Sequence, residues 1–200
     1  MRHQLSVSLL ALVLAAGLAA CDPRQEPVTE SPLRLTASIQ EIMNSLVDPA
    51  ADGIWDAFST IVTATGTETR QPTTDEEWKA ARHHAIALIE AGNLLLIDGR
   101  KVAQAGKALD DAGTPGLLTA PEIEKVIAED RAGYVKAVHA LQNTGLAVLA
   151  AIDSRNPEAV FQAAGRIERN CEACHVKFWY PNAKGPNLAD FAKPAKAGDR

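Results

Sequence analysis

Apolar side chains recur every three or four residues along most of the chain, and this spacing is typical of amphipathic α-helices. The first helical stretch follows Ser31-Pro32, which provides an N-cap and a first-turn proline, and its apolar face continues to Gly66. Asp48-Pro49 interrupts this stretch and either kinks the helix or restarts it. No segment shows a convincing two-residue alternation, so the pattern predicts no strand.

The second helix follows a polar loop at 65–74 and begins at a capping box formed by Thr74 and Glu77. We expect it to reach about residue 97 and to be followed by a weaker helical piece that ends at Ala112. Four glycines in this region are spaced seven residues apart, and they either let a neighbouring helix approach closely or break the helix: Gly92, Gly99, Gly106 and Gly113.

A turn region at 112–121 leads to another capping box, Thr119 with Glu122, and to a long third helix of about 30 residues. Asn156-Pro157 caps a fourth helix, whose apolar face contains Val160, Ala164, Ile167, Cys171, Cys174 and Phe178. The predicted fold class is all-α, an antiparallel four-helix bundle over residues 33–180, followed by a loosely packed tail at 181–200.

The first 20 residues have the pattern of a secretion signal. An apolar run from Leu5 to Leu18 follows a charged start and is short for a membrane span. It leads into Ala-Ala-Cys21, which resembles a bacterial lipobox, and this resemblance implies that Cys21 becomes the lipidated N-terminus of the mature chain. The alternative is a soluble secreted protein in which Cys21 is a stray thiol. Residues 21–32 then form a proline-containing tether.

Charge and composition exclude some classes of function. The chain of 200 residues has a net charge of −5 and no basic patch that would suggest nucleic-acid binding. An acidic surface suits a redox partner protein with a positive docking face. Asp22, directly after Cys21, resembles the inner-membrane retention signal of enteric bacteria and favours that membrane over the outer one. No pattern indicates a general base, a nucleophile or a substrate pocket, so we do not expect an enzyme.

The strongest motif is Cys171-Glu172-Ala173-Cys174-His175, the Cys-x-x-Cys-His signature of covalent c-type haem attachment. Each thiol can form a thioether with a porphyrin vinyl group, and the adjacent imidazole is a strong donor to the iron. Three other interpretations remain open: part of a zinc site, a thioredoxin-like redox pair and a structural disulfide. The three cysteines of the chain are accounted for by one lipid anchor and two haem thioethers.

The position of this motif near the C-terminus, on the last predicted helix, resembles the class II cytochromes c, which comprise cytochrome c′ and the low-spin cytochromes c556. The resemblance implies one covalent haem c held inside the bundle, with His175 as the proximal iron ligand. It also implies that Met43, on the first helix, is the distal iron ligand. Met43 is otherwise a core methionine, and His83, His84 or His139 would be alternative donors.

The function expected from these features is electron transfer by a cytochrome attached to a membrane in the bacterial periplasm. A five-coordinate, gas-binding haem protein of the cytochrome c′ type is the first alternative, and the resemblance leaves a homodimer possible. The second alternative is a structural or partner-binding lipoprotein without haem.

Overall fold

The computed structural model describes residues 33–183, and the chain divides into an N-terminal unit that ends at Arg34 and a unit that starts at Leu35. We call the described part of the second unit, residues 35–183, the helical unit. Most of its residues are helical, as an all-α fold requires, but it also contains one two-stranded sheet. The predicted signal segment 1–20, the lipidation site Cys21 and the tail from residue 184 lie outside the described residues.

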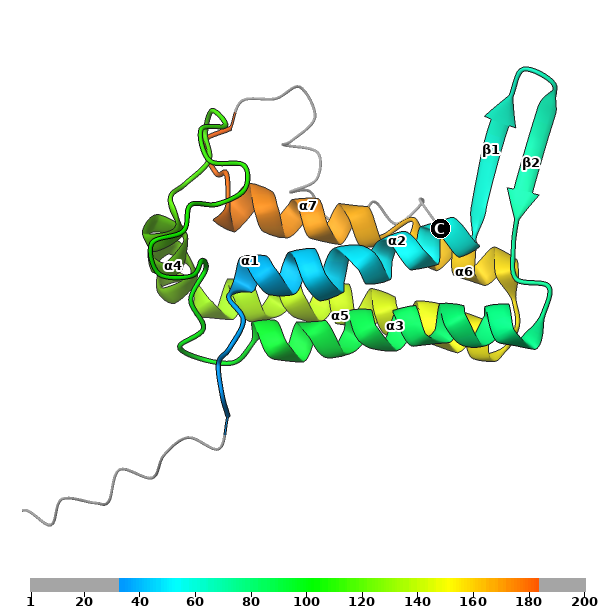
Figure 1. Cartoon of the computed structure of the whole chain (residues 1–200), viewed down its shortest axis with the longest axis horizontal. Helices are drawn as coiled ribbons and strands as arrows, with labels where there is room; N and C mark the ends of the chain where they lie inside the picture. Colours follow the sequence, from blue (N-terminus) through cyan, green and yellow to red (C-terminus); the bar gives the residue numbers. More distant parts are fainter. Residues whose placement is uncertain (1–32, 184–200) are drawn as a thin grey trace, which may run out of the picture. The chain divides into compact units, whose positions relative to one another are not determined.

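The elements follow one another in the chain order that Figure 1 labels. They are α1 (Ile39–Ile42), the π-helix η1 (Met43–Val47), α2 (Asp48–Ala57), β1 (Ser59–Thr63), β2 (Gly66–Arg70), α3 (Asp75–Leu95), α4 (Ala120–Glu129), α5 (Arg131–Asp153), α6 (Pro157–Ala164) and α7 (Ile167–Phe178).

The first helix begins at Ile39, later than the prediction from Ser31-Pro32, because a capping box forms at Ser38. The Ser38 hydroxyl accepts a hydrogen bond from the Glu41 backbone N–H at 3.2 Å, and the Glu41 carboxylate accepts one from the Ser38 backbone N–H at 2.8 Å. Residues 101 and 102 cover this end of the helix, where their carbonyls accept the backbone N–H groups of Ile39 and Gln40.

The helix passes through Pro49 without stopping, and η1 is the feature that allows this. In a regular α-helix the ring of Pro49 would collide with the carbonyl of Ser45, four residues earlier. Here the turn before the proline is wider, since the backbone N–H of Asp48 donates to the carbonyl of Met43 five residues back. Asp48 has helical backbone angles, so it does not restart the helix as an N-cap.

A β-hairpin replaces the predicted continuation of the first helix to Gly66, so the prediction of no strand was wrong. The helix ends at Ala57, and β1 pairs antiparallel with β2 in the register Ser59 to Arg70. Gly66 has a φ of +149°, which favours glycine at the turn. Neither strand buries a face, because the side chains of both are exposed or half-buried.

The prediction of a further helical piece after Asp98 was also wrong. α3 ends at Leu95, and 96–119 is a series of turns in which four glycines have φ values between +74° and +96°: Gly99, Gly106, Gly113 and Gly116. Val102 and Leu109 are buried and anchor this loop on the core. Residues 112–119 of the turn region predicted at 112–121 are therefore part of a longer loop, and its last two residues already belong to α4.

The third and fourth predicted helices are each divided in two. Asp130 separates α4 from α5, and its carboxylate accepts a hydrogen bond from the Gly133 N–H at 2.9 Å as the N-cap of α5. Asn156 caps α6 as predicted, with its side-chain oxygen 3.0 Å from the Ala159 N–H. Gly165 and Arg166 then form a turn before α7.

Two glycines let α3 and α5 approach each other closely. A Cβ at Gly92 would lie 2.5 Å from the side chain of Gln142, and one at Gly145 would lie 2.8 Å from Cγ1 of Ile89. α5 also packs against α6 and α7, and α3 packs against α2 (Figure 1). Among residues 33–183, α5 is the one helix long and apolar enough to cross a membrane, but many of its side chains are buried in the core of this unit.

The Gly145→Ala variant should be less stable than the wild type. The added methyl group overpacks a buried contact, which costs about 1–3 kcal/mol, more than the gain of about 1 kcal/mol from a better helix former. Urea unfolding of both proteins measures the difference. The control is Gly165→Ala, since its Cβ would make only an ordinary contact 3.6 Å from the Phe161 carbonyl. Equal stability of Gly145→Ala and wild type would contradict the close approach.

The capping box of α3 should make part of the stability depend on pH. Hydrogen bonds from the backbone N–H groups of Thr73 and Thr74 lower the pKa of Glu77. Its contribution is therefore complete above the ordinary glutamate pKa of about 4.3 and is lost as the pH falls through the lowered value. In urea unfolding at pH 7 and pH 3, Glu77→Gln should lose less stability on acidification than the wild type. Glu76→Gln, outside the box, should behave as the wild type does.

Candidate functional site

The motif residues lie in the middle of α7, and contacts with α5 hold this part of the helix on both sides. Before the motif, the Asn170 side-chain amide donates to the Thr144 hydroxyl at 2.7 Å and to the Ala140 carbonyl at 3.2 Å. After it, the ring of Phe178 meets the ring of Tyr134 edge-on at 5.5 Å. The motif thus has a fixed position relative to the core.

Cys171, Cys174 and His175 occupy one turn of α7. Both cysteines are free thiols, half-buried and packed against the core between the fully buried Ile167 and Phe178. This packing confirms the prediction that both cysteines lie on the core-facing side of the last helix. The side chain of His175 is 31% exposed, so it is accessible from outside the core.

The environment of the thiols differs from that of a redox-active pair. Burial raises the pKa of the Cys171 thiol to about 11 and that of the Cys174 thiol to about 12. Reactive pairs have lowered values and lie at helix N-termini, whereas Cys171 is in the interior of α7. The pair therefore presents two neutral thiols to the interior, and the thioredoxin-like interpretation is not supported.

The donor set fits a haem better than a zinc ion. Within residues 33–183 no cluster of three or more His, Cys, Asp or Glu side chains is arranged to hold a metal, and zinc requires about four such ligands. A c-type haem needs two thiols for its vinyl groups and one imidazole for its iron, all within one helical turn. Those are the groups that α7 brings together.

Two aromatic rings at the end of α7 lie beside His175. The backbone N–H groups of Trp179 and Tyr180 both donate to the His175 carbonyl, at 2.8 and 3.0 Å, and the chain turns there. The rings of Trp179 and Tyr180 lie 6.2 and 6.0 Å from the imidazole, centroid to centroid. The Tyr180 hydroxyl also donates to the Glu172 carboxylate at 2.5 Å.

The first helix is linked to the motif electrostatically through Asp48, the first residue after η1. Burial raises the pKa of Asp48, and an electrostatic interaction with His175 acts in the opposite direction. The π turn brings residues five apart onto similar faces, which is why Ile42 and Val47 are both buried. Met43 is related to Asp48 by the same five-residue step. It is half-buried and packs on the core cluster that also contacts both motif cysteines.

The alternative histidine donors lie elsewhere. His83 and His139 are exposed. His84 packs against α2 at Gly53, where a Cβ would lie 2.5 Å from three atoms of its ring. Gly53 is ten residues beyond Met43 along the first helix, so the imidazole of His84 contacts α2 and not η1.

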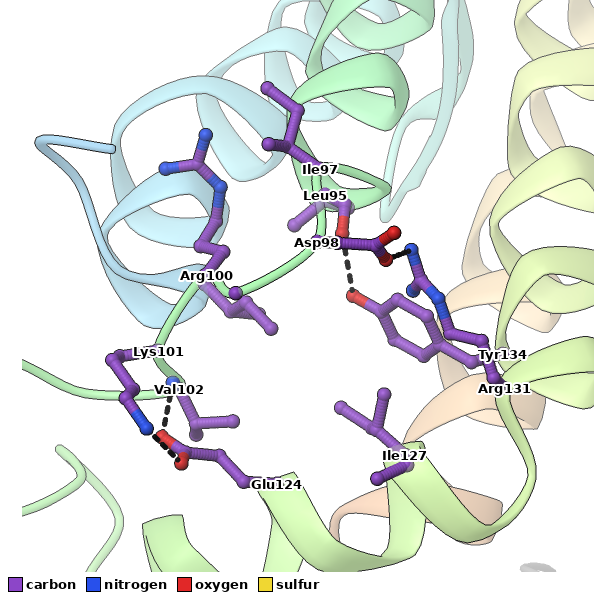
Figure 2. A pocket seen from close by; sticks show the side chains of 13 residues that line it. Leu95, Ile97, Asp98, Arg100, Lys101, Val102, Glu124, Ile127, Arg131 and Tyr134 are labelled. Carbon is purple, nitrogen blue, oxygen red and sulfur yellow. Dashed lines mark hydrogen bonds and ion pairs between the residues drawn. The ribbon is translucent and has the colours of Figure 1, made fainter. Parts of the chain in front are cut away.

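A half-open cavity of about 250 Å³ lies where the loop after α3 meets α4 and α5 (Figure 2). Its wall includes Leu95, Ile127 and Tyr134, and the charged side chains that line it all have partners. Arg100 donates to the backbone carbonyl of Leu94 at 2.8 Å. Lys101 pairs with Glu124 at 2.9 Å, and Arg131 pairs with Asp98 at 2.7 Å. Since the charged side chains around the cavity already have partners within the chain, the cavity indicates no particular ligand.

The motif itself was visible in the sequence, but three of its neighbours were not predicted. Asp48 was recognised only as part of a helix interruption, although it interacts electrostatically with His175. Glu172 occupies a variable position of the motif, and Tyr180 was grouped with the core aromatics. A polar residue three before the histidine and a tyrosine five after it are the only signals, and neither is specific.

Comparison of the chain with protein-family models, with characterised proteins and with solved structures found no match.

Proposed function

We propose that this chain is a c-type cytochrome that transfers electrons and carries one haem, attached covalently to Cys171 and Cys174. The observation that carries the proposal is the donor set on α7, two free thiols and an imidazole on one turn at the edge of the core. The bound haem would supply one-electron chemistry at its iron. The haem-free alternative, a structural lipoprotein, gives no reason for this grouping.

Each residue has a role in this proposal. Cys171 and Cys174 anchor the porphyrin through thioethers, and His175 binds the iron on one side. Met43 is the proposed ligand on the other side, as the resemblance to the low-spin class II cytochromes implies. Its packing on the core and the electrostatic interaction of Asp48, five residues later, with His175 support this proposal. A thioether ligand raises the reduction potential and leaves no open coordination position for a gas.

The architecture we propose is an antiparallel four-helix bundle around the haem. Its four members would be α1 to α2, α3, α5, and α6 with α7. Packing of α3 on α2 and α5, and of α5 on α6 and α7, supports this arrangement. We also propose a periplasmic location with a lipid anchor at Cys21, favoured at the inner membrane, and a redox protein as partner. The lipobox-like sequence and Asp22 support the location.

Haem staining of a denaturing gel tests the attachment. The full chain, expressed in bacteria that carry out c-type haem maturation, should stain, and the double variant Cys171→Ala, Cys174→Ala should not. Cys21→Ser should keep the stain, since this cysteine lies outside the motif. A wild type without stain, or a double variant that keeps it, would overturn the assignment.

Visible spectroscopy tests the role of Met43. The reduced wild type should be low-spin and insensitive to carbon monoxide, and Met43→Ala should become high-spin and bind it, because the sixth ligand is lost. Leu46→Ala is the matched control, as it removes a partly exposed side chain from the same π-helix. A wild type that binds carbon monoxide as readily as Met43→Ala would reject Met43 as a ligand and favour the gas-binding alternative.

A further inference from the structure

The imidazole of His175 has a carboxylate next to one of its two ring nitrogens. Oε1 of Glu172, one helical turn earlier, lies 3.7 Å from Nδ1 of His175. The other carboxylate oxygen, Oε2, accepts a hydrogen bond from the Tyr180 hydroxyl at 2.5 Å. The side chains of Glu172 and His175 are about equally exposed, at 28% and 31%, so this contact is partly shielded from water.

The end of α7 holds the three side chains together. Tyr180 lies beside His175 because the chain turns at Trp179, where two backbone N–H groups share the His175 carbonyl. The loop before α4 fixes this turn, since the Leu118 N–H donates to the Trp179 carbonyl at 2.9 Å. Tyr180 is thus placed by backbone hydrogen bonds on both sides, and its hydroxyl in turn fixes the direction of the Glu172 carboxylate.

We propose that Glu172, oriented by Tyr180, is a positioning residue that keeps the proton of the neutral His175 ring on Nδ1 and leaves Nε2 free to bind a metal. A neutral imidazole has one N–H donor and one acceptor nitrogen, and a carboxylate can only accept. At 3.7 Å the carboxylate is beyond hydrogen-bond distance, but its negative charge still attracts an N–H at Nδ1 and disfavours a lone pair there, so it selects the tautomer. Carboxylates fix metal-binding histidines in this way and make them stronger donors.

One consequence rests on the proposed function. With His175 as an iron ligand, a carboxylate at Nδ1 adds negative charge that stabilises the oxidised iron relative to the reduced iron. Glu172 would thus lower the reduction potential. The Asp48 carboxylate, at the start of α2, also interacts electrostatically with His175, and its contribution is one of charge. The tautomer separates the two effects, because Oε1 of Glu172 lies 3.7 Å from Nδ1 and, within residues 33–183, no ion pair joins Asp48 to this ring.

The first experiment is independent of haem. Nitrogen-15 NMR of the histidine side chains in the full chain without haem, checked for helix content by circular dichroism and recorded above the ordinary histidine pKa, identifies the tautomer of His175. The wild type should carry the proton on Nδ1. Glu172→Ala should shift the population towards Nε2, and Glu172→Gln should shift it less because the amide oxygen still accepts. An unchanged tautomer in Glu172→Ala would overturn the proposal.

The second experiment uses the haem-loaded full chain, in which Glu172→Ala and Glu172→Gln both lose the charge but only the alanine variant also loses the acceptor at Nδ1. At a fixed applied potential, Glu172→Ala and Glu172→Gln should each raise the ratio of reduced to oxidised protein, and the alanine variant should raise it more. Tyr180→Phe should raise it less, since it releases the carboxylate without removing it. Equal effects of Glu172→Ala and Glu172→Gln would reject the positioning role.

Glu168→Gln is the control, because it removes an exposed charge one turn earlier on α7. A ratio that changes equally in Glu168→Gln and Glu172→Gln would reject the specific role of Glu172. The gel stain separates this failure from that of the proposed function, since all these variants should keep the haem if the wild type has it.

Discussion

The close approach of α3 and α5 determines where the other helices of this unit can lie. Gly92 and Gly145 remove the side chains that would separate the two helices, and Gln142 and Ile89 occupy the space. α5 then offers its remaining sides to α6 and α7. Because Thr144 binds the start of the motif helix, the position of the motif follows from this one helix pair.

The sequence predicted the features that depend on local hydrogen bonds. The capping boxes at Thr74 and Thr119 and the cap at Asn156 start helices where they were expected, because a cap needs only residues three apart. The apolar face of the last helix was also predicted, since Ile167 and Phe178 are fully buried.

The predictions that were wrong concern segments in which the spacing of apolar residues does not indicate the structure. The hairpin buries no face, so Thr60 to Thr63 show no alternation, and Ile61 and Val62 could be assigned to a helix. Between α3 and α4 the glycine spacing matched a helix face, yet Gly99 and Gly106 have φ values that no helix allows. The break between α4 and α5 at Asp130 was not predicted either. The apolar spacing continues across it, and the sequence does not distinguish an aspartate that caps a new helix from one inside a continuous helix.

The hairpin is a segment in which the sequence can vary during evolution with little effect on the helices. It leaves the first helix at Ala57, at the opposite end from Met43, and its strands place no side chain in the core. Two exposed strands are marginally stable by themselves, so this segment contributes little to the folding of the helices. Insertions, deletions and substitutions between Ser59 and Arg70 are therefore weakly constrained, and this segment can diverge in length and sequence while the motif helix is retained.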